Sequence, residues 1–386
     1  MIIESLELKD YRNYESLNIK LSSGVNIFYG DNAQGKTNIL ESIYLATTSK
    51  SHRGSKDKDI IKFESNESHI KLMIEKNNSS VRLDMHLKKS KSKGVAINGI
   101  PIRKLSELFG TCNVVFFSPE DLNIIKRSPK ERRNFVDMEL CQLNKLYVST
   151  LVTYNKVLDQ RNKLLKEIGF KSGVEDTLDI WDMQLVKYGK DLIAYREDFI
   201  KELNEVIYGI HSVLSGGEKI NVVYEKNVEK DGFEEELKKS RTSDIRYKTT
   251  NVGPHRDDFS FFLNGEMDLK KFGSQGQQRS LALSLKLSEI ELIKSRYGEF
   301  PVLLLDDVLS ELDGKRQSHL LESIKHIQTL ITCTGVEDFL NKSLDIGKVF
   351  KVTKGTIKEN EEFNVVVPTG NFGNILAGYI AKKLGI

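Results

Sequence analysis

The stretch "NIFYGDNAQGKTNILESIYLA", residues 26–46, decides the fold of this chain. It begins with apolar residues typical of a buried strand, passes through a turn containing Gly30 and Gly35, and ends in a run of helix formers. Gly-x-x-x-x-Gly-Lys-Thr between a strand and a helix is the pattern of a phosphate-binding loop. The alternative is a chance glycine turn before a lysine. It is disfavoured because all eight positions fit the motif and because a strand precedes it and a helix follows it.

This loop predicts where the phosphates of a nucleotide and a metal ion would bind. The two glycines allow the backbone to form a nest of N–H groups, and the helix adds its positive N-terminal end. We expect Lys36 to reach the β- and γ-phosphates and the Thr37 hydroxyl to bind Mg²⁺. The residues expected to line the nest between the glycines are Asp31, Asn32, Ala33 and Gln34.

A second motif, "PVLLLDDVLSELD" at residues 301–313, has the composition of a buried strand that ends in two carboxylates. We expect Asp306 to hold Mg²⁺ indirectly and Asp307 to polarise an attacking water. The alternative is a core strand with a solvated acidic end. Because the two motifs lie near residues 36 and 306, whereas one strand-helix-strand unit takes about 30 residues, the nucleotide domain must contain a large insertion.

The stretch "FGSQGQQRS", residues 272–280, precedes a run without glycine or proline up to Tyr297. An unbroken run of this length predicts a helix, with Leu283, Leu287, Ile290 and Ile293 facing the core. A helix N-terminus has backbone N–H groups without partners, and we expect it to act as an anion receptor. The residues predicted to contact the anion are Ser274, Gly276 and Gln277.

Two phosphate receptors in one chain suggest a symmetric pair of chains. The loop at residues 30–37 already surrounds the phosphates from one side. The helix start at Ser274 therefore makes most sense if it closes over the γ-phosphate held by another copy, so that two nucleotides are sandwiched in a two-fold dimer. Hydrolysis removes the group that both copies contact, and the dimer would then open.

The middle of the chain is predicted to be helical, because no proline occurs from Lys130 to Gly253. Ser128 and Pro129 predict a helix start, with Glu131 closing a capping box. The pattern favours one helix to about Ile168 and a second from about Leu178 to Leu214.

The flanking regions contain short alternating segments, with Asn98-Gly99 and Asn264-Gly265 as predicted hairpin turns. We therefore expect an α/β fold with a discontinuous P-loop ATPase domain and an inserted α-helical arm. The predicted domains are residues 1–125 with 250–360, the arm 126–249, and a separate tail 361–386.

Composition limits the function only broadly. The chain has 58 Lys+Arg and 55 Asp+Glu, so its net charge of +3 argues for no particular partner. Three widely spaced cysteines predict reduced thiols rather than disulfides or zinc. No apolar run has the length of a signal peptide or of a membrane span. We expect a soluble, cytoplasmic protein without a membrane partner.

Local basic clusters are the candidates for DNA contact, because such clusters neutralise phosphates without regard to sequence. The interpretation as ordinary solvated loops stays open. The predicted DNA-binding residues are Lys88, Lys89, Lys91, Lys93, Arg127 and Arg132.

Several motifs together resemble a known family. The phosphate loop, "GSQGQQR", "LLLDD" and "SELD" resemble the ABC-type ATPase head. More closely, the chain resembles the bacterial RecF recombination-mediator family. The further matching segments are "DYRNY" (10–14), "SHRGSKDKDII" (51–61), "FSPEDLNIIKRSPKERRNFVD" (117–137) and "VGPHRDDF" (252–259).

The resemblance implies ATP-dependent dimerisation, weak ATP hydrolysis stimulated by DNA, and binding at gapped DNA where single and double strands meet. It implies roles in recombination, repair and replication, with RecR and RecO as partners and indirect help in loading the recombinase RecA. It also implies that Arg12, Asn13 and Arg53 contact the nucleotide; for Arg12 and Arg53, surface salt bridges are the equal alternative.

The chain departs from the ABC transporter pattern in two places. Asp307 stands where glutamate is usual, and the strand "TLITCTG" (329–335) ends without the usual histidine. Both departures favour a slow switch over rapid turnover. The stretch "LSGGE" (214–218) looks like the transporter signature, but the strand pattern after it favours a turn.

Two other functions are weighed, a nucleotide-binding subunit of a transporter and a chromosome-structural SMC-like ATPase. The stretch "GSQGQQR" at 273–279 does not match the transporter signature, which argues against the first. The helical arm is too short for a long coiled coil, which argues against the second. The last stretch, residues 364–386, resembles the glycine-rich segment of threonine synthase. Because the rest of such an enzyme is absent, we expect no cofactor chemistry there.

Overall fold

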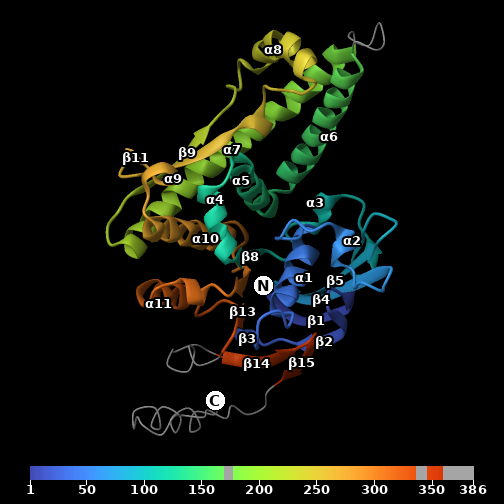
Figure 1. Cartoon of the computed structure of the whole chain (residues 1–386), viewed down its shortest axis with the longest axis vertical. Helices are drawn as coiled ribbons and strands as arrows, with labels where there is room; N and C mark the ends of the chain where they lie inside the picture. The colour runs from blue at the N-terminus through green and yellow to red at the C-terminus, as the bar shows by residue number, and fades with distance from the viewer. Residues whose placement is uncertain (169–176, 336–345, 360–386) are drawn as a thin grey trace. The chain divides into compact units, whose positions relative to one another are not determined.

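The structure, a computed structural model, describes residues 1–168, 177–335 and 346–359 (Figure 1). The chain divides into two units. Unit 1 comprises Met1–Arg103, Thr111–Pro119 and Glu299–Ile386, and unit 2 comprises Lys104–Gly110 and Glu120–Gly298. Both ends of the chain therefore build unit 1, and unit 2 is inserted between them.

Unit 1 contains a six-stranded sheet of order β15-β14-β3-β13-β12-β8. The pairings of β14, β3, β13, β12 and β8 are parallel, and β15 is an antiparallel edge. The central strands are almost entirely apolar and buried, as expected for a parallel sheet covered on its faces. The elements are β3 (Val25–Tyr29), β8 (Val114–Phe117), β12 (Val302–Asp306), β13 (Thr329–Cys333), β14 (Ile346–Thr353) and β15 (Thr356–Glu359), with helices α1 (Lys36–Thr48), α2 (Asp57–Ile60), α11 (Gly314–Ser323) and the 3₁₀ turn η4 (Leu309–Glu311).

A second sheet of unit 1 is antiparallel, in the order β2-β1-β4-β5-β6-β7. Its strands alternate: in β4, Ser68, Ile70 and Leu72 are buried, whereas Glu67 and His69 are exposed. This period of two means that one face packs on the core and the other meets solvent. The strands are β1 (Ile2–Tyr11), β2 (Tyr14–Lys20), β4 (Glu67–Lys76), β5 (Ser79–Lys88), β6 (Gly94–Ile97) and β7 (Ile100–Pro101).

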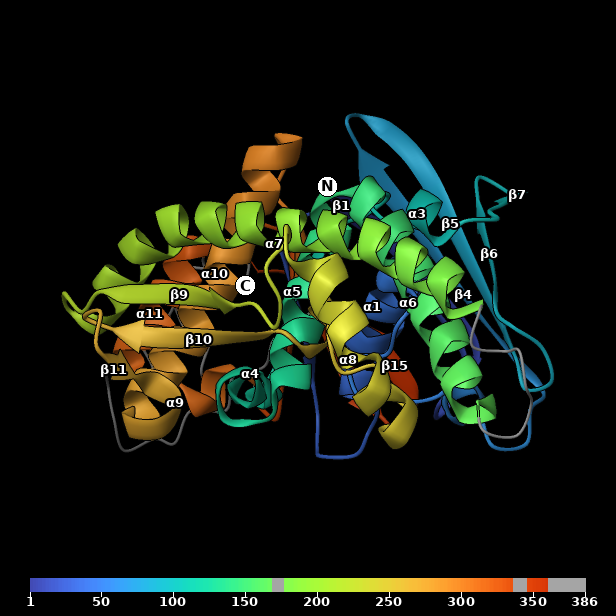
Figure 2. The ribbon, with the colours of Figure 1, turned by 90° about the horizontal axis from the view of Figure 1, so that it is seen from above.

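Unit 2 is mainly helical, and its helices α6 and α7 lie side by side with α8 against both of them (Figure 1). Helix α7 also lies along the strand β9, as Figure 2 shows. The elements are α3 (Leu105–Leu108), α4 (Leu122–Lys126), α5 (Pro129–Leu143), α6 (Lys145–Glu167), α7 (Leu178–Ser215), α8 (Phe233–Tyr247), η3 (Pro254–Arg256), α9 (Leu269–Phe272) and α10 (Gln275–Tyr297), the sheet β9 (Ile220–Glu225), β10 (Asp258–Leu263) and β11 (Met267–Asp268), and the turn η1 (Pro119–Asp121), which begins at the end of unit 1.

The structure corrects the first predicted helix in two respects. It is not continuous, because Asn144 adopts an extended conformation and its side chain accepts hydrogen bonds from the N–H groups of Leu146 and Tyr147, which starts α6. Ser128 does stand at the N-cap of α5 with Pro129 next to it, but the side chain of Ser128 makes no capping hydrogen bond. The second predicted helix, here α7, is confirmed.

Two buried arginines hold the helices of unit 2 together. Arg161 on α6 pairs with Asp182 on α7 at 2.6 Å and with Asp244 on α8 at 2.8 Å. Arg196 on α7 pairs with Asp137 and Asp257, each at 2.8 Å. Removing one partner of such a pair leaves a buried charge uncompensated, which costs about 3–5 kcal/mol. These side chains make the packing of the helices specific.

Both predicted hairpin turns are confirmed. Asn98 and Gly99 have φ values of 52° and 80° between β6 and β7, and Asn264 and Gly265 have values of 52° and 84° between β10 and β11. Unit 2 extends to Gly298, beyond the predicted end of the arm at residue 249, because β9 pairs with β10 across that point. The division into an ATPase head and an arm at residues 126 and 249 remains a prediction.

Candidate nucleotide site

The phosphate loop of unit 1 connects the central strand β3 to α1, at the carboxyl ends of the parallel strands. Ligands of open α/β sheets bind at this edge. Gly30 has φ 148° and Gly35 has φ 112°, and Ala33 between them is also left-handed at φ 64°. A Cβ atom at Gly30 would lie 2.4 Å from the carbonyl oxygen of Val352. The glycines are therefore required by the backbone, and the exposed Asp31, Asn32 and Ala33 form the mouth of the loop.

The phosphate loop and the acidic strand meet, as the two motifs together predicted. The Thr37 hydroxyl donates to Asp306 Oδ1 at 2.7 Å, although the residues are far apart in the chain. Asp306 ends β12, and its oxygen also accepts from the hydroxyl of Thr332 on the adjacent strand β13 at 2.8 Å. Lys36 is buried, and its ammonium group donates to the carbonyl oxygens of Gly30 and Asp31 at 2.6 and 2.9 Å. The hydroxyl of Thr37, the carboxylate of Asp306 and the ammonium group of Lys36 thus lie together at the phosphate loop.

Asp307 lies beside this group in a left-handed conformation, with φ 51°. Burial raises the pKa of its carboxyl above the ordinary value, the charge of Lys36 lowers it, and the charge of Asp306 raises it further. Its backbone N–H donates to the Thr332 hydroxyl at 3.0 Å. A carboxylate with a raised pKa next to a phosphate site is a better proton acceptor than a free one, which is the property a general base needs.

Two turns from distant parts of the chain hold the loop in place. From the β1–β2 turn, Asn13 donates to the carbonyl oxygen of Gln34 at 2.9 Å and Tyr14 donates to that of Gly35 at 3.1 Å. From the β14–β15 turn, the N–H groups of Lys354 and Gly355 donate to the side-chain and backbone oxygens of Gln34, at 2.7 and 3.1 Å. The loop is therefore preorganised by the tertiary structure rather than by its own sequence.

The two arginines predicted to contact nucleotide differ in the structure. Arg12 makes a bidentate ion pair with the buried Glu41, at 2.9 and 2.8 Å, and donates to the hydroxyl of Ser55 at 2.8 Å. Burial raises the pKa of Glu41, but hydrogen bonds from Arg12 and Ser51 bring that pKa below its ordinary value. Arg12 thus forms a salt bridge with a buried carboxylate, and its contact with a nucleotide remains a prediction. Arg53 is exposed and donates to the side chain of Asn38 on α1 at 3.4 Å.

The predicted anion receptor of unit 2 is the N-terminus of α10, and the helix is confirmed. Ser274 and Gln277 form a capping box: the Ser274 hydroxyl accepts from the Gln277 N–H at 3.2 Å, and the Gln277 side-chain oxygen accepts from the Ser274 N–H at 3.0 Å. This N–H of Gln277 therefore already has a partner, contrary to our expectation. The Gln277 amide group also donates to Glu218 at 2.9 Å.

The stretch Leu214–Glu218 contains the last two residues of α7 and the predicted turn after them. Gly216 ends α7 with φ 82°, and β9 follows from Ile220. Its last residue, Glu218, contacts the helix start through Gln277. The stretch that resembles a transporter signature thus contacts the start of α10 through Glu218. It begins no helix itself.

The predicted DNA-binding residues are divided by their contacts. Arg132 is buried, and its guanidinium forms a bidentate ion pair with Asp258 at 2.6 and 2.8 Å, so we withdraw it as a DNA contact. Lys93 donates to the Ser49 carbonyl and to Asp57. The other predicted residues have side chains that reach solvent, wholly or in part: Lys88, Lys89, Lys91 and Arg127.

Sequence patterns missed the residues that position the site from other strands and turns. Thr332, Lys354 and Gly355 contact the site only because β13 and β14 lie next to β12 and β3. A polar residue at the carboxyl end of a parallel strand is a signal for Thr332, since such ends meet at one edge. No local signal marks the backbone N–H groups of Lys354 and Gly355.

This sheet, with a phosphate loop after its central strand and an acidic strand end beside it, defines an ABC-type ATPase head. Residues 2–358 match the family described as RecF/RecN/SMC N terminal domain. The chain is 61% identical over 364 residues to the DNA replication and repair protein RecF of Lachnospira eligens, covering 93% of this chain and 100% of that protein. It is 58% identical to the same protein of Lachnoclostridium phytofermentans, with the same coverage. The chain belongs to the RecF family of DNA replication and repair proteins.

Solved structures agree with this assignment. The chain resembles the recombination mediator protein RecF with ATP, in a structure of the RecFOR pathway, with a TM-score of 0.86 and 34% identity, covering 93% of this chain and 97% of that one. An Smc head bound to the C-terminal winged-helix domain of ScpA matches at 16% identity and a TM-score of 0.54, which shows a shared fold alone.

Among the described residues, no helix is both long and apolar enough to cross a membrane. The segment 364–386, which resembles a piece of threonine synthase, lies outside the described residues.

Proposed function

We propose that this chain is an ATP-dependent DNA-binding protein of recombinational repair, which two bound ATP molecules close into a dimer at gapped DNA and which slow hydrolysis reopens. The observation that carries the proposal is the contact between Thr37 and Asp306, beside the buried Lys36. It joins a phosphate loop to an acidic strand end in the arrangement that ATPases use.

The oxygen donors of the site fit Mg²⁺, which prefers hydroxyl, carboxylate and water oxygens over nitrogen or sulfur. Thr37 would hold the ion directly and Asp306 through water, and the bound ion would neutralise charge on the phosphates. Lys36 would exchange its two carbonyl partners for phosphate oxygens. Asp307, with its raised pKa, would accept a proton from the attacking water.

The chemistry of the second receptor supports the proposed dimer. The start of α10 presents the exposed Ser274 hydroxyl and the positive end of a 23-residue helix, with Gly276 leaving room for close approach. A γ-phosphate already held by Lys36 of one copy offers the anion that this helix end can bind in another copy. Ser274 and Gln277 would then couple nucleotide state to association.

DNA binding would use Lys88, Lys89, Lys91 and Arg127, basic residues whose side chains reach solvent wholly or in part. Lys91, on the loop after β5, and Arg127, at the end of α4, are both exposed, which suits non-specific contact with phosphates. Because relatives are named as RecF of the RecFOR pathway, we propose RecR and RecO as partners and RecA as the recombinase that benefits. We also propose that the protein acts in the cytoplasm.

Analytical ultracentrifugation of the full chain tests the proposal. With Mg²⁺ and a non-hydrolysable ATP analogue, the sedimenting mass should double. Ser274→Arg should bind a fluorescent ATP analogue normally but stay monomeric, since the added side chain blocks the receptor. Ser92→Arg, at an exposed serine of unit 1, is the matched control and should dimerise. A chain that remains monomeric when saturated with the analogue would contradict the proposal.

A further inference from the structure

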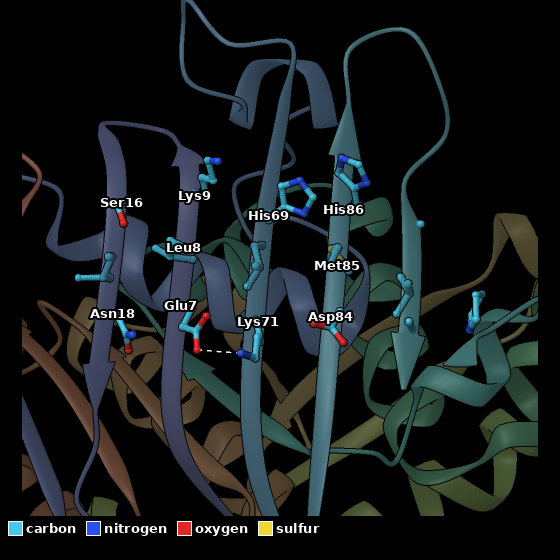
Figure 3. Close-up of a pocket in the computed structure, with 16 residues that line it drawn as sticks. Glu7, Leu8, Lys9, Ser16, Asn18, His69, Lys71, Asp84, Met85 and His86 are labelled. Atoms are coloured by element: carbon cyan, nitrogen blue, oxygen red, sulfur yellow. Dashed lines mark hydrogen bonds and ion pairs between the residues drawn. The ribbon is translucent and has the colours of Figure 1, made fainter. Parts of the chain in front are cut away.

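The solvent face of the antiparallel sheet in unit 1 carries two histidines opposite each other on neighbouring strands. His69 on β4 pairs in register with His86 on β5. Their imidazole rings are stacked, with centroids 3.9 Å apart and an angle of 21° between the planes. Figure 3 shows both rings on the same side of the sheet. Directly opposed residues of an antiparallel pair are the closest neighbours that a sheet offers.

A carboxylate completes the cluster. Glu67 lies two residues before His69, so it projects from the same face of β4. Its Oε2 atom lies 3.0 Å from Nε2 of His86. One ligand atom from each of the three residues can be chosen so that all lie within 4.8 Å of one another.

We propose that Glu67, His69 and His86 bind a divalent transition-metal ion, with Zn²⁺ the ion that best fits the donors. Two imidazole nitrogens and one carboxylate oxygen are ligands of zinc, whereas Mg²⁺ and Ca²⁺ prefer oxygen alone. Ligands of a tetrahedral zinc ion at about 2.0–2.1 Å are separated by about 3.3 Å. Glu67 and His69 are exposed and His86 is partly exposed, so side-chain rotation is available to bring the ligand atoms to this separation.

The surroundings leave the cluster accessible. The residue opposite His86 on its other side is Gly94 of β6, and a Cβ atom placed there would meet nothing within 4 Å. A hollow of about 550 Å³ adjoins both histidines on this face, and its lining includes Lys71 and Asp84 (Figure 3). Three protein ligands and an open side leave the fourth position of the ion to water or to an outside ligand.

Two lysines lie beside the cluster. Lys9 is opposite His69 on β1, and Lys88 pairs with Glu67 at 3.6 Å. Lys88 also competes with a metal for Glu67.

Zinc titration of the untagged full chain tests the site. Metal-free protein without nucleotide would be titrated against a chromophoric zinc chelator, which reports affinity and stoichiometry. We expect the wild-type chain to bind one zinc ion. In both His69→Ala and His86→Ala this binding should be lost, or its affinity reduced by more than about tenfold, because removing even an outer partner of a metal ligand usually lowers the affinity by at least about tenfold. Lys88→Gln should tighten binding, since it frees Glu67.

Matched controls separate this cluster from adventitious zinc. His319→Ala removes a histidine on α11, and Asp84→Asn removes a charge from the same sheet face; both should retain the ion. Urea unfolding midpoints would establish that the variants fold, as expected for changes on a solvent face. Zinc binding that survives in both histidine variants, or that is absent in the folded wild-type protein, would overturn the proposal. Either result would leave the ATP-driven dimer untouched.

Discussion

The phosphate loop of unit 1 and the start of α10 in unit 2 are both predicted to receive an anion, but they are held in different ways. Gln34 and Gly35 are held by Asn13 and Tyr14 at the β1–β2 turn and by the β14–β15 turn, two segments far apart in the chain. The start of α10 is tied mainly by its own capping box, between Ser274 and Gln277. A receptor held from many sides is ready before the ligand arrives. A receptor held by local bonds can exchange them for a phosphate from another molecule.

The largest effect is expected from Lys36→Ala, which removes the ammonium group of the preorganised receptor. A hydrogen bond to a charged group contributes about 1.5–3 kcal/mol, so losing contacts to two phosphates should weaken ATP binding by at least about 100-fold. Titration of a fluorescent ATP analogue measures this, with Lys354→Ala as control because only the backbone of Lys354 contacts the loop. If Lys36→Ala bound the ATP analogue as tightly as the wild type, the phosphate loop would not be the nucleotide site.

Gly30→Ala tests whether the loop depends on its close packing. The new methyl group would lie 2.4 Å from the Val352 carbonyl at a φ of 148°, so unfolding should become easier by about 2–3 kcal/mol. Gly54→Ala, at φ 70° with nothing within 4 Å, should cost only about 1 kcal/mol. Urea unfolding monitored by circular dichroism compares the two. If they were equally destabilised, close packing would not explain the glycine.

The free energy of unfolding should depend on pH because of a buried carboxyl on α5, a helix that packs against α10 in unit 2. Burial raises the pKa of Glu139 to about 7, while the charge of Lys286 opposes this. The folded chain then holds a proton that the unfolded chain loses near pH 4.5. The stability from this proton is complete below about pH 4.5 and is lost as pH rises to about 7, by about 1.4 kcal/mol per pH unit. Urea unfolding at pH 5, 6 and 7 measures how the free energy of unfolding depends on pH. This dependence should be weaker in Glu139→Gln than in the wild type, and an unchanged dependence would contradict the assignment to Glu139.

The smallest effect is expected from Glu218→Gln, at the locally held receptor. The carboxylate of Glu218 accepts from Gln277 and places negative charge near the start of α10, where a phosphate would bind. Its amide replacement can still accept the hydrogen bond but lacks the charge. ATP-driven association should tighten by about two- to fivefold, as expected for one charge at a helix end. Sedimentation at several protein concentrations measures this; Glu229→Gln, a charge elsewhere in unit 2, should leave association unchanged.

Most elements that carry the candidate site could be predicted from local patterns. The phosphate loop, the strand ending at Asp306 and the helix 275–297 depend on residue types at fixed spacing. The break at Asn144 was missed, although asparagine is a good N-cap, because the surrounding helical periodicity continues through it. The burial of Arg132 was missed because its partner, Asp258, is distant in sequence and a lysine- and arginine-rich stretch resembles a solvated surface.

By itself, the sequence determined the kinds of elements, the two glycines of the phosphate loop and the RecF family resemblance, since these follow from local backbone and side-chain chemistry. Only the tertiary structure decided which groups meet: Thr37 with Asp306, Arg12 with Glu41, and His69 with His86. The physical reason is that strand order and register bring distant residues together. A pattern read along the chain contains the chemistry of each residue, but the order of strands in a sheet depends on how all of them pack.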